Sequence, residues 1–76
     1  KSMKLSMEEV SYKFGENLRE IRLEKNITQE EVAKKLKVGT STYANWEQGR
    51  REPSLYYLIL LAEFFEVDMN TLFDLL

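Results

Sequence analysis

The side chains of this chain that could act on another molecule are hydrogen-bonding and cationic groups. The sequence contains no Cys and no His, which excludes a zinc finger, a disulfide-bonded knot and catalysis by a His base or a Cys nucleophile. Its many carboxylates lie among basic neighbours, as on solvated helix faces. The sequence has no Gly-rich phosphate loop, metal-ligand cluster or nucleophile–base pair. We therefore expect a protein that is not an enzyme and that uses no metal or cofactor.

The length and the net charge of the chain further limit the possible classes of protein. A chain of 76 residues should form one domain with a small core. Its net charge of −2, taken alone, argues against nucleic-acid binding. The charges are unevenly spread, however, because residues 52–76 carry five acids and no base while residues 28–51 carry five bases and three acids. Basic character is thus available in the middle of the chain, and the acidic end should restrain non-specific binding.

Apolar residues recur at helical spacing, so we predict an all-α fold of five short helices. The longest apolar run, residues 55–62, is too short to span a bilayer, and we expect no membrane contact. Ser6 and Glu9 have the spacing of a capping box, which would start the first helix at Met7. Gly15 weakens a helix and favours a start near Phe14 instead. One face of this helix is apolar: Val10, Phe14, Leu18 and Ile21.

Caps mark the remaining helices. Thr28 with Glu31 is a second capping box and opens the second helix. Gly49 is a C-terminal stop for the third helix, and Ser54 and Asp68 are N-caps for the fourth and fifth. The residues expected to face inward on these helices are Val32, Ala33, Leu36, Leu55, Leu58, Leu61, Ala62, Phe65, Leu72, Phe73, Leu75 and Leu76.

Two short helices joined by three or four residues have the geometry of a helix-turn-helix. The segments ITQEEVA at 27–33 and YANWEQGRREP at 43–53 resemble the Cro/CI-type (XRE family) helix-turn-helix domain. The resemblance implies a compact, lambda-repressor-like domain over residues 14–76, with residues 1–13 as an N-terminal extension or the start of helix one. It also implies a sequence-specific double-stranded DNA-binding transcriptional regulator, expected to be a repressor. Such a protein would be bacterial or phage-encoded, cytoplasmic and nucleoid-associated.

The resemblance assigns DNA contacts. Residues 40–48 would lie in the major groove, where hydroxyls contact donors or acceptors, Asn pairs with adenine and Ala packs on a thymine methyl. The expected base-reading residues are Thr40, Ser41, Ala44 and Asn45. The expected phosphate-binding residues are Gln29, Lys35, Tyr43, Gln48, Arg50 and Arg51. Several of these assignments have plain alternatives. Thr40 could cap the helix, Ser41 could be an ordinary first-turn residue and Gln29 a neutral solvated side chain. The two arginines could belong to a solvated loop.

The resemblance also implies structural roles. Arg22 and Glu47 would form a partly buried salt bridge between the first and third helices. Tyr43 should be half-buried with its hydroxyl near a phosphate. Lys37 stands where the family favours Gly, and Gly39 where it favours a Ser or Thr cap. Either departure could shift the register of the base-reading residues by about one position.

A second apolar stripe on the fourth helix predicts a partner. Tyr56, Leu60 and Phe64 follow one another at four-residue spacing. We expect a homodimer on a palindromic operator, since exposed patches mark association sites. The residues expected to complete its interface are Leu72, Leu75 and Leu76. Alternatively, the fifth helix or an N-terminal extension carrying Met3, Leu5 and Met7 could cover this stripe.

The alternative function is a protein-interaction or antitoxin-like module on the same fold, with DNA binding secondary or lost. Such a module needs no basic face, so the electrostatics around Arg50, Arg51 and the lysines of the second helix discriminate between the two. No small-molecule ligand is evident from the sequence.

Overall fold

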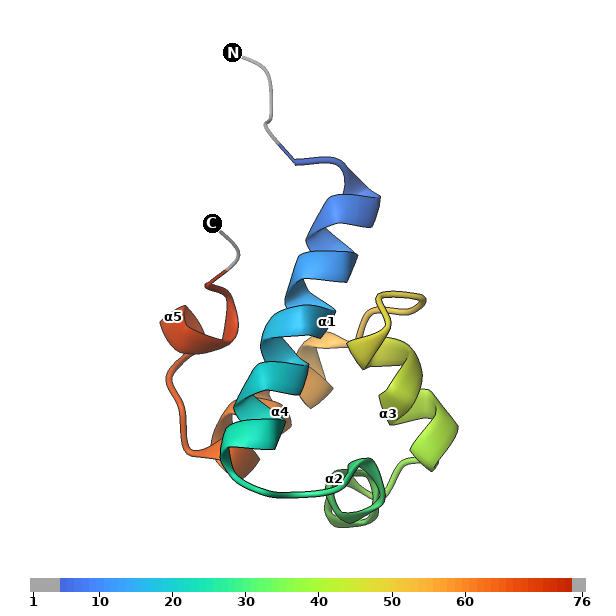
Figure 1. Ribbon diagram of the computed structural model, residues 1–76, viewed down its shortest axis with the longest axis vertical. Helices are drawn as coiled ribbons and strands as arrows, with labels where there is room; N and C mark the ends of the chain where they lie inside the picture. The colour runs from blue at the N-terminus through green and yellow to red at the C-terminus, as the bar shows by residue number, and fades with distance from the viewer. Residues whose placement is uncertain (1–4, 75–76) are drawn as a thin grey trace.

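Residues 5–74, which the computed structural model describes, form five α-helices and no strand (Figure 1). The all-α prediction is confirmed. The bounds of the helices are α1 Met7–Glu24, α2 Gln29–Leu36, α3 Thr40–Glu47, α4 Leu55–Phe65 and α5 Met69–Leu72. Both α1 and α2 pack against α3, so α3 is held from two sides. No helix in this range is both long enough and apolar enough to cross a membrane.

The first helix begins at Met7 and continues through Gly15. Its capping box is formed, because the Glu9 N–H donates to Ser6 Oγ at 3.2 Å and the Ser6 N–H donates to Glu9 Oε1 at 2.9 Å. A start near Phe14 is therefore wrong, and residues 7–13 belong to α1. Gly15 is tolerated because α1 passes close to the end of α3 there. A Cβ on Gly15 would lie 2.3 Å from the carbonyl oxygen of Glu47, so only glycine permits this approach.

The turn between α2 and α3 uses Lys37 in the left-handed conformation, with φ 60° and ψ 43°. A non-glycine residue there costs roughly 1–2 kcal/mol. The turn is held by the N–H of Val38, which donates to the carbonyl of Ala33 at 3.0 Å. Gly39 is the N-cap of α3 and offers no side-chain hydrogen bond, so Thr40 is not the cap. With Gly39 as its N-cap, α3 begins at Thr40.

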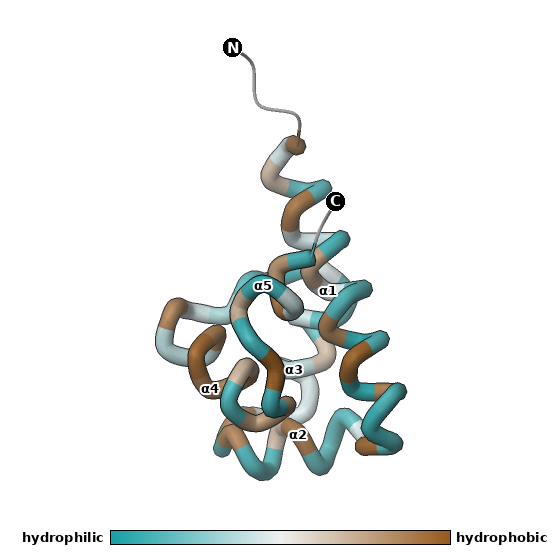
Figure 2. The backbone as a smooth tube through the Cα atoms, turned by 90° about the vertical axis from the view of Figure 1, so that its left-hand side faces the viewer, coloured by the Kyte–Doolittle hydropathy of each residue, from teal (hydrophilic) through white to brown (hydrophobic). Residues whose placement is uncertain are grey.

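The core lies between α1, α2, α3 and α4 and is closed at one end by α5. Figure 2 shows apolar and polar positions alternating along α1 and α2, as expected for helices with one buried face. The core residues are Phe14, Leu18, Ile21, Val32, Ala33, Leu36, Tyr43, Trp46, Leu61, Ala62, Phe65 and Leu72. Leu55 was expected among them, but it is 71% exposed at the first turn of α4, so that prediction is wrong. Nearly every residue of α4 is apolar, so periodicity alone could not orient it.

Candidate nucleic-acid interface

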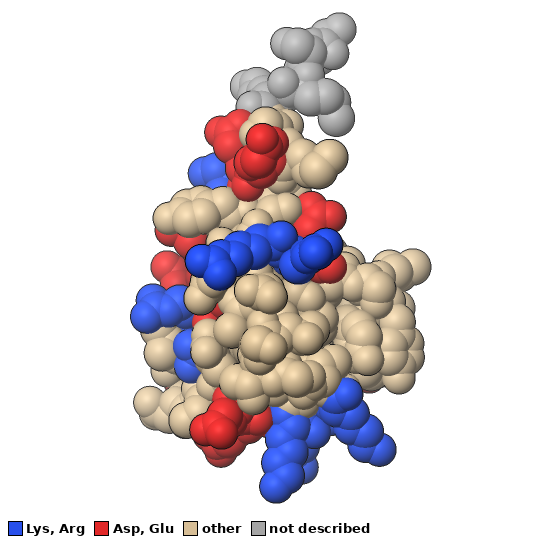
Figure 3. Space-filling view, turned by 90° about the vertical axis from the view of Figure 1, so that its right-hand side faces the viewer, with Lys and Arg blue, Asp and Glu red and all other residues tan. Residues whose placement is uncertain are grey.

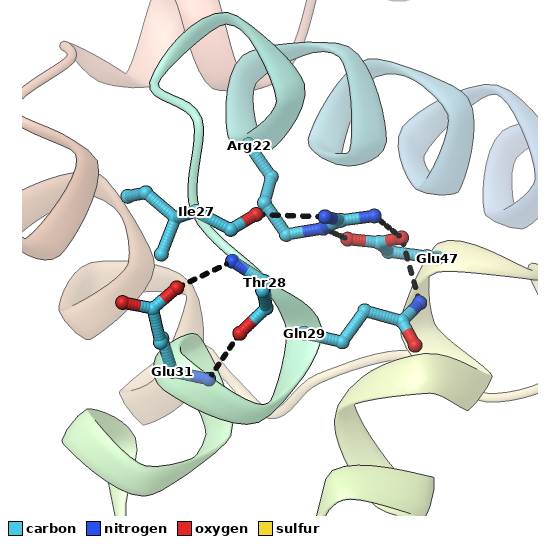
Figure 4. A network of polar contacts seen from close by, with 6 residues as sticks. All are labelled: Arg22, Ile27, Thr28, Gln29, Glu31 and Glu47. Atoms are coloured by element: carbon cyan, nitrogen blue, oxygen red, sulfur yellow. Dashed lines mark hydrogen bonds and ion pairs between the residues drawn. The ribbon is translucent and has the colours of Figure 1, made fainter.

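The position of α3 is set by a buried ion pair between Arg22 of α1 and Glu47 at the end of α3 (Figure 4). Arg22 Nε lies 2.6 Å from Glu47 Oε2, and Arg22 Nη2 donates to Glu47 Oε1 at 3.1 Å. The two side chains are 10% and 2% exposed. This is a bidentate contact, which fixes orientation as well as distance. The predicted salt bridge is confirmed.

The ion pair is part of a larger network that also holds the start of α2. Gln29 Nε2 donates to Glu47 Oε1 at 2.9 Å, and Arg22 Nη1 donates to the carbonyl of Ile27 at 2.8 Å. Figure 4 shows these groups converging from α1, the connection to α2, and the end of α3. We call Arg22, Ile27, Gln29 and Glu47 the buried network. The sequence did not reveal that Gln29 belongs to it, because a residue at a helix start gives no sign of a partner 18 positions away.

The network favours the charged forms of both partners. Burial raises the pKa of the Glu47 carboxyl, but the hydrogen bonds from Arg22 and Gln29 outweigh it and hold that pKa below the ordinary value. The hydrogen bond to Glu47 raises the pKa of Arg22 despite partial burial. Both groups are therefore ionised across the neutral range, and the pair depends on pH only in acid.

Tyr43 is a core residue, which contradicts its predicted role as a phosphate contact. It has no exposed surface, and its ring packs edge-on against Trp46 with centroids 5.9 Å apart. Burial raises the pKa of its hydroxyl, and the nearby Glu47 carboxylate adds to the rise. That hydroxyl nevertheless has no hydrogen-bond partner among residues 5–74. A phosphate could not reach it without opening the core.

The outer surface of α3 is uncharged. Thr40, Ser41 and Thr42 are exposed in its first turn, while Ala44 and Asn45 are half-buried. Figure 3 shows this neutral surface facing the viewer, with basic side chains above it and others projecting from the end of the molecule formed by α2. We call Thr40, Ser41, Ala44 and Asn45 the reading face. Its groups can donate or accept hydrogen bonds at neutral pH without a charge of their own.

The loop that follows α3 carries two exposed arginines and is folded back on the helix. The carbonyl of Asn45 accepts hydrogen bonds from the N–H groups of Arg50 at 3.0 Å and Arg51 at 3.4 Å. Gly49 turns the chain with φ 75°, and its Cα lies so close to Tyr12 of α1 that an added Cβ would be 2.9 Å from the Tyr12 Cα. The backbone carrying both arginines is thus fixed beside the reading face, while their side chains are free to contact an anion.

Three long-range hydrogen bonds from two side chains of α1 also hold the helices together, and no sequence pattern predicted them. Ser11 Oγ donates to Glu52 Oε2 at 2.6 Å, which ties the arginine loop to α1. Asn17 Nδ2 donates to the carbonyls of Thr71 and Leu72 at 2.8 and 2.7 Å, which holds α5 against α1. In both pairs the partners are more than forty positions apart. A polar residue on the partly buried side of α1 was the only available signal.

The remaining phosphate candidates fall in different places. Gln48 is exposed at the end of α3, beside the arginine loop. Lys35 is exposed on α2, but it lines a groove with Ile27 and Phe64 and not the reading face. The structure therefore brings Gln48, Arg50 and Arg51 together at one end of α3, and leaves Lys35 apart.

The predicted dimer residues are only partly exposed. Tyr56 is 63% exposed, whereas Leu60 and Phe64 are half-buried against the core. Leu72 is fully buried, so its assignment to an interface is wrong. Leu75, Leu76 and Met3 lie outside the described residues. Met7 is 77% exposed at the start of α1, so its side chain is not buried against another helix. The exposed apolar residues at the start of α4 are Leu55, Tyr56 and Ile59.

Comparison with known proteins agrees with this arrangement. The family model described as Helix-turn-helix matches residues 18–72, which is more than half of the chain. The chain belongs to this helix-turn-helix family. The matched region contains α2, α3, the arginine loop and the whole buried network. The resemblance to Cro/CI-type domains is thereby confirmed.

Individual relatives are similar over the same region. The chain is 36% identical over 59 residues to the HTH-type transcriptional activator BcrR of Enterococcus faecalis, covering 78% of this chain and 29% of BcrR. It is 37% identical over 59 residues to the cryptic phage CTXphi transcriptional repressor RstR of Vibrio cholerae, covering 78% of this chain and 53% of RstR. It is 39% identical over 57 residues to the uncharacterized HTH-type transcriptional regulator YqaF of Bacillus subtilis, covering 75% of each. The chain thus spans about a third to a half of the first two relatives.

Proposed function

We propose that this helix-turn-helix domain binds double-stranded DNA in a sequence-specific manner and regulates transcription, with α3 in the major groove. The observation that carries the proposal is the neutral, hydrogen-bonding reading face with arginines fixed beside it. Base edges are read by neutral donors and acceptors, whereas phosphates are bound by cations. The two kinds of group are arranged here in adjacent zones, as a helix lying between two phosphate backbones requires.

The reading face and the arginine loop have different roles in the proposed DNA contact. Asn45 offers the bidentate amide that suits adenine, and Thr40 and Ser41 offer hydroxyls at the end of α3 that enters the groove first. Arg50 and Arg51 contact phosphates beyond the end of α3, and Gln48 assists them. Gln29 has one amide hydrogen committed to Glu47 and a second that can reach a phosphate at the start of α2. The buried network then links that phosphate contact to the orientation of α3.

We also propose that the protein acts as a homodimer on a palindromic operator. Leu55 and Tyr56 form an exposed apolar surface at the start of α4, and exposed apolar side chains of this size favour association. A two-fold dimer would place two reading faces about 34 Å apart, one turn of DNA. A sedimentation profile that stays monomeric at high concentration in both low and high salt would contradict this part of the proposal.

Repression is the regulatory outcome that we favour. A small domain that occupies an operator blocks other proteins from that DNA without any further contact, which is sufficient for repression. RstR is named a repressor and BcrR an activator, so activation would require a surface beyond the reading face. Such a protein would act at the nucleoid in the cytoplasm. The alternative of an interaction module is disfavoured by the arginine loop, because a basic zone fixed beside α3 serves no purpose in a neutral contact.

The proposal is tested by selecting bound sites from a pool of random duplex DNA at a fixed salt concentration. We expect an enriched palindromic motif with half-sites one helical turn apart. Arg50→Ala should recover the same motif with weaker enrichment. Arg19→Ala is the matched control, since it removes the same charge from an exposed position on α1. Recovery of no motif by the wild-type protein would favour the interaction-module alternative.

A further inference from the structure

Two grooves flank the C-terminal half of α4, and they carry opposite charges. The first, which we call the basic groove, has Ile27 and Phe64 as its apolar floor and Lys34, Lys35 and Lys37 around it. Glu31 also lines this groove, but its carboxylate accepts the N–H of Thr28 at 2.8 Å in the capping box of α2. The three lysines are exposed and determine the charge of the rim. Figure 3 shows basic side chains projecting from this end of the molecule.

The second groove, which we call the acidic groove, lies along the other side of α4. Three carboxylates, those of Glu63, Glu66 and Asp68, surround an apolar floor. The floor residues are Ile59, Ala62, Val67 and Met69. At about 100° per residue, Phe64 lies roughly 140° from Ile59 and about 200° from Ala62 around the helix. The two grooves therefore open in different directions, and one molecule cannot bring its own two grooves together.

Among residues 5–74 the three lysines, Glu63 and Glu66 form no ion pair, whereas the Asp68 carboxylate accepts the N–H of Thr71 at 2.8 Å as the N-cap of α5. Arg22–Glu47 is the one ion pair among residues 5–74, and it involves neither groove. The basic groove thus combines its apolar floor with three lysines and the single carboxylate of Glu31, and the acidic groove combines its floor with three carboxylates and no cation. A surface of that kind is complementary to one that presents apolar side chains among charges of the opposite sign.

We propose that the basic groove of one molecule binds the acidic rim of a second copy of this chain. The acidic groove supplies what the basic groove lacks: three carboxylates matched to three lysines, and the apolar side chains of Ile59 and Met69, which are 48% and 37% exposed, matched to Phe64 and Ile27. Because the two surfaces are different, the contact is head-to-tail and leaves a free groove on each outer molecule. It can therefore join copies beyond a two-fold dimer.

This contact is separate from the proposed DNA interface. None of the reading-face residues or the loop arginines lines either groove. The contact is built largely from exposed charges, so it should be weak in solution and should weaken further as salt screens it. Copies bound at neighbouring sites on one DNA molecule would meet at high effective concentration, where a weak contact has its largest effect.

Sedimentation of charge-reversed variants tests the contact. At low salt the wild-type protein should form species larger than a dimer, and high salt should remove them. Lys34→Glu with Lys37→Glu should abolish the larger species, and so should Glu63→Lys with Glu66→Lys. Mixing the two double variants should restore association, because each then supplies the groove that the other has lost. Absence of larger species for the wild-type protein at low salt would overturn the proposal.

Matched controls separate this contact from a general effect of charge. Arg19→Glu with Lys25→Glu changes the net charge by the same amount as the lysine reversal, and Glu16→Lys with Glu20→Lys matches the glutamate reversal; all four residues are exposed on or beside α1. Each control should keep the wild-type behaviour. If either control loses the larger species as the groove variants do, bulk charge and not the grooves drives association.

A single substitution tests whether the charge-reversed variants fail to associate because they have lost the contact or because they have lost the fold. Lys37→Gly removes one rim charge and relieves the left-handed backbone conformation at that position. It should raise the melting temperature and still reduce the amount of the larger species. A variant that is more stable and associates as well as the wild type would exclude Lys37 from the contact.

Discussion

Glu47 and Asn45 lie two residues apart on α3, yet the side chain of Glu47 is buried and that of Asn45 lies at the edge of the exposed surface. Glu47 is 6% exposed and accepts three hydrogen bonds from Arg22 and Gln29. Asn45 is half-buried at the edge of the helix, and within residues 5–74 only its backbone carbonyl takes part in hydrogen bonds to the arginine loop. One residue is fixed by partners inside the protein, and the other keeps its side-chain amide available for a partner outside it. The buried face of α3 holds the helix in place, while its exposed face stays available to contact another molecule.

This separation predicts which changes affect folding and which affect recognition. Substitutions of Arg22 or Glu47 should lower stability and affect DNA binding only through that loss. Substitutions on the reading face or in the arginine loop should change DNA binding and leave the melting temperature nearly unchanged.

The largest effect is expected for Glu47→Ala. Removing the carboxylate leaves the guanidinium of Arg22 buried without its partner, which should lower the free energy of unfolding by about 3–5 kcal/mol. Chemical denaturation measures this directly. An unchanged denaturation midpoint would show that the pair does not hold α3 in place.

The pH dependence of the same contact provides a second test. The pKa of Glu47 is lower in the folded protein than its ordinary value of 4.5. The pair therefore stabilises the fold fully above pH 4.5, and this contribution is lost as the pH falls through the folded-state pKa. Glu47→Gln cannot titrate, so the stability difference between it and the wild type should narrow below pH 4.5. A constant difference from neutral to acid pH would contradict the ionised pair.

Gly15→Ala tests the close approach of α1 and α3. The added Cβ would meet the carbonyl oxygens of Glu47 and Trp46 at 2.3 and 2.7 Å, so the two helices must move apart. We expect a loss of about 1–3 kcal/mol in spite of the better helix propensity of alanine. Gly39→Ala is the steric control, since its Cβ would meet only Thr42 Oγ1 at 3.7 Å and its loss should be limited to the poorer N-cap of α3. Equal stabilities for the two variants would show that the close approach is not required.

Arg50→Ala should have the smallest effect on the fold and a uniform effect on binding. In the proposed complex the exposed guanidinium contacts a phosphate, so binding to specific and random DNA should weaken alike. The slope of log affinity against log salt should become shallower by about one unit. The melting temperature should match that of the wild type. A loss confined to one DNA sequence would instead place Arg50 at a base.

The ends of the helices could be predicted because the residues that cap a helix are close together in the sequence. Two capping boxes, the stop at Gly49 and the caps at Ser54 and Asp68 all lie where the sequence places them, since each involves residues three or four apart. The Arg22–Glu47 pair was predictable only through the family resemblance, because its partners are 25 positions apart.

The errors share a physical cause, which is that burial depends on packing between distant elements. Leu55 was assigned to the core because α4 is too apolar for periodicity to distinguish its faces, and Leu72, correctly expected to face inward, was wrongly assigned to an interface as well. Tyr43 was expected at a phosphate, but its ring is in the core beside Trp46. Gly15 gave the one usable hint, since a glycine inside a helix often marks a close contact.

The binding affinities of Asn45→Ala measure directly whether Asn45 reads a base. The affinities of the wild type and the variant should be compared on the selected operator and on each of its single-base-pair substitutions. We predict that the variant loses discrimination of about 1–3 kcal/mol at one base pair in each half-site and keeps its preferences elsewhere. Its melting temperature should be unchanged. A uniform loss at every position, or no loss at any, would contradict the placement of this face of α3 in the major groove.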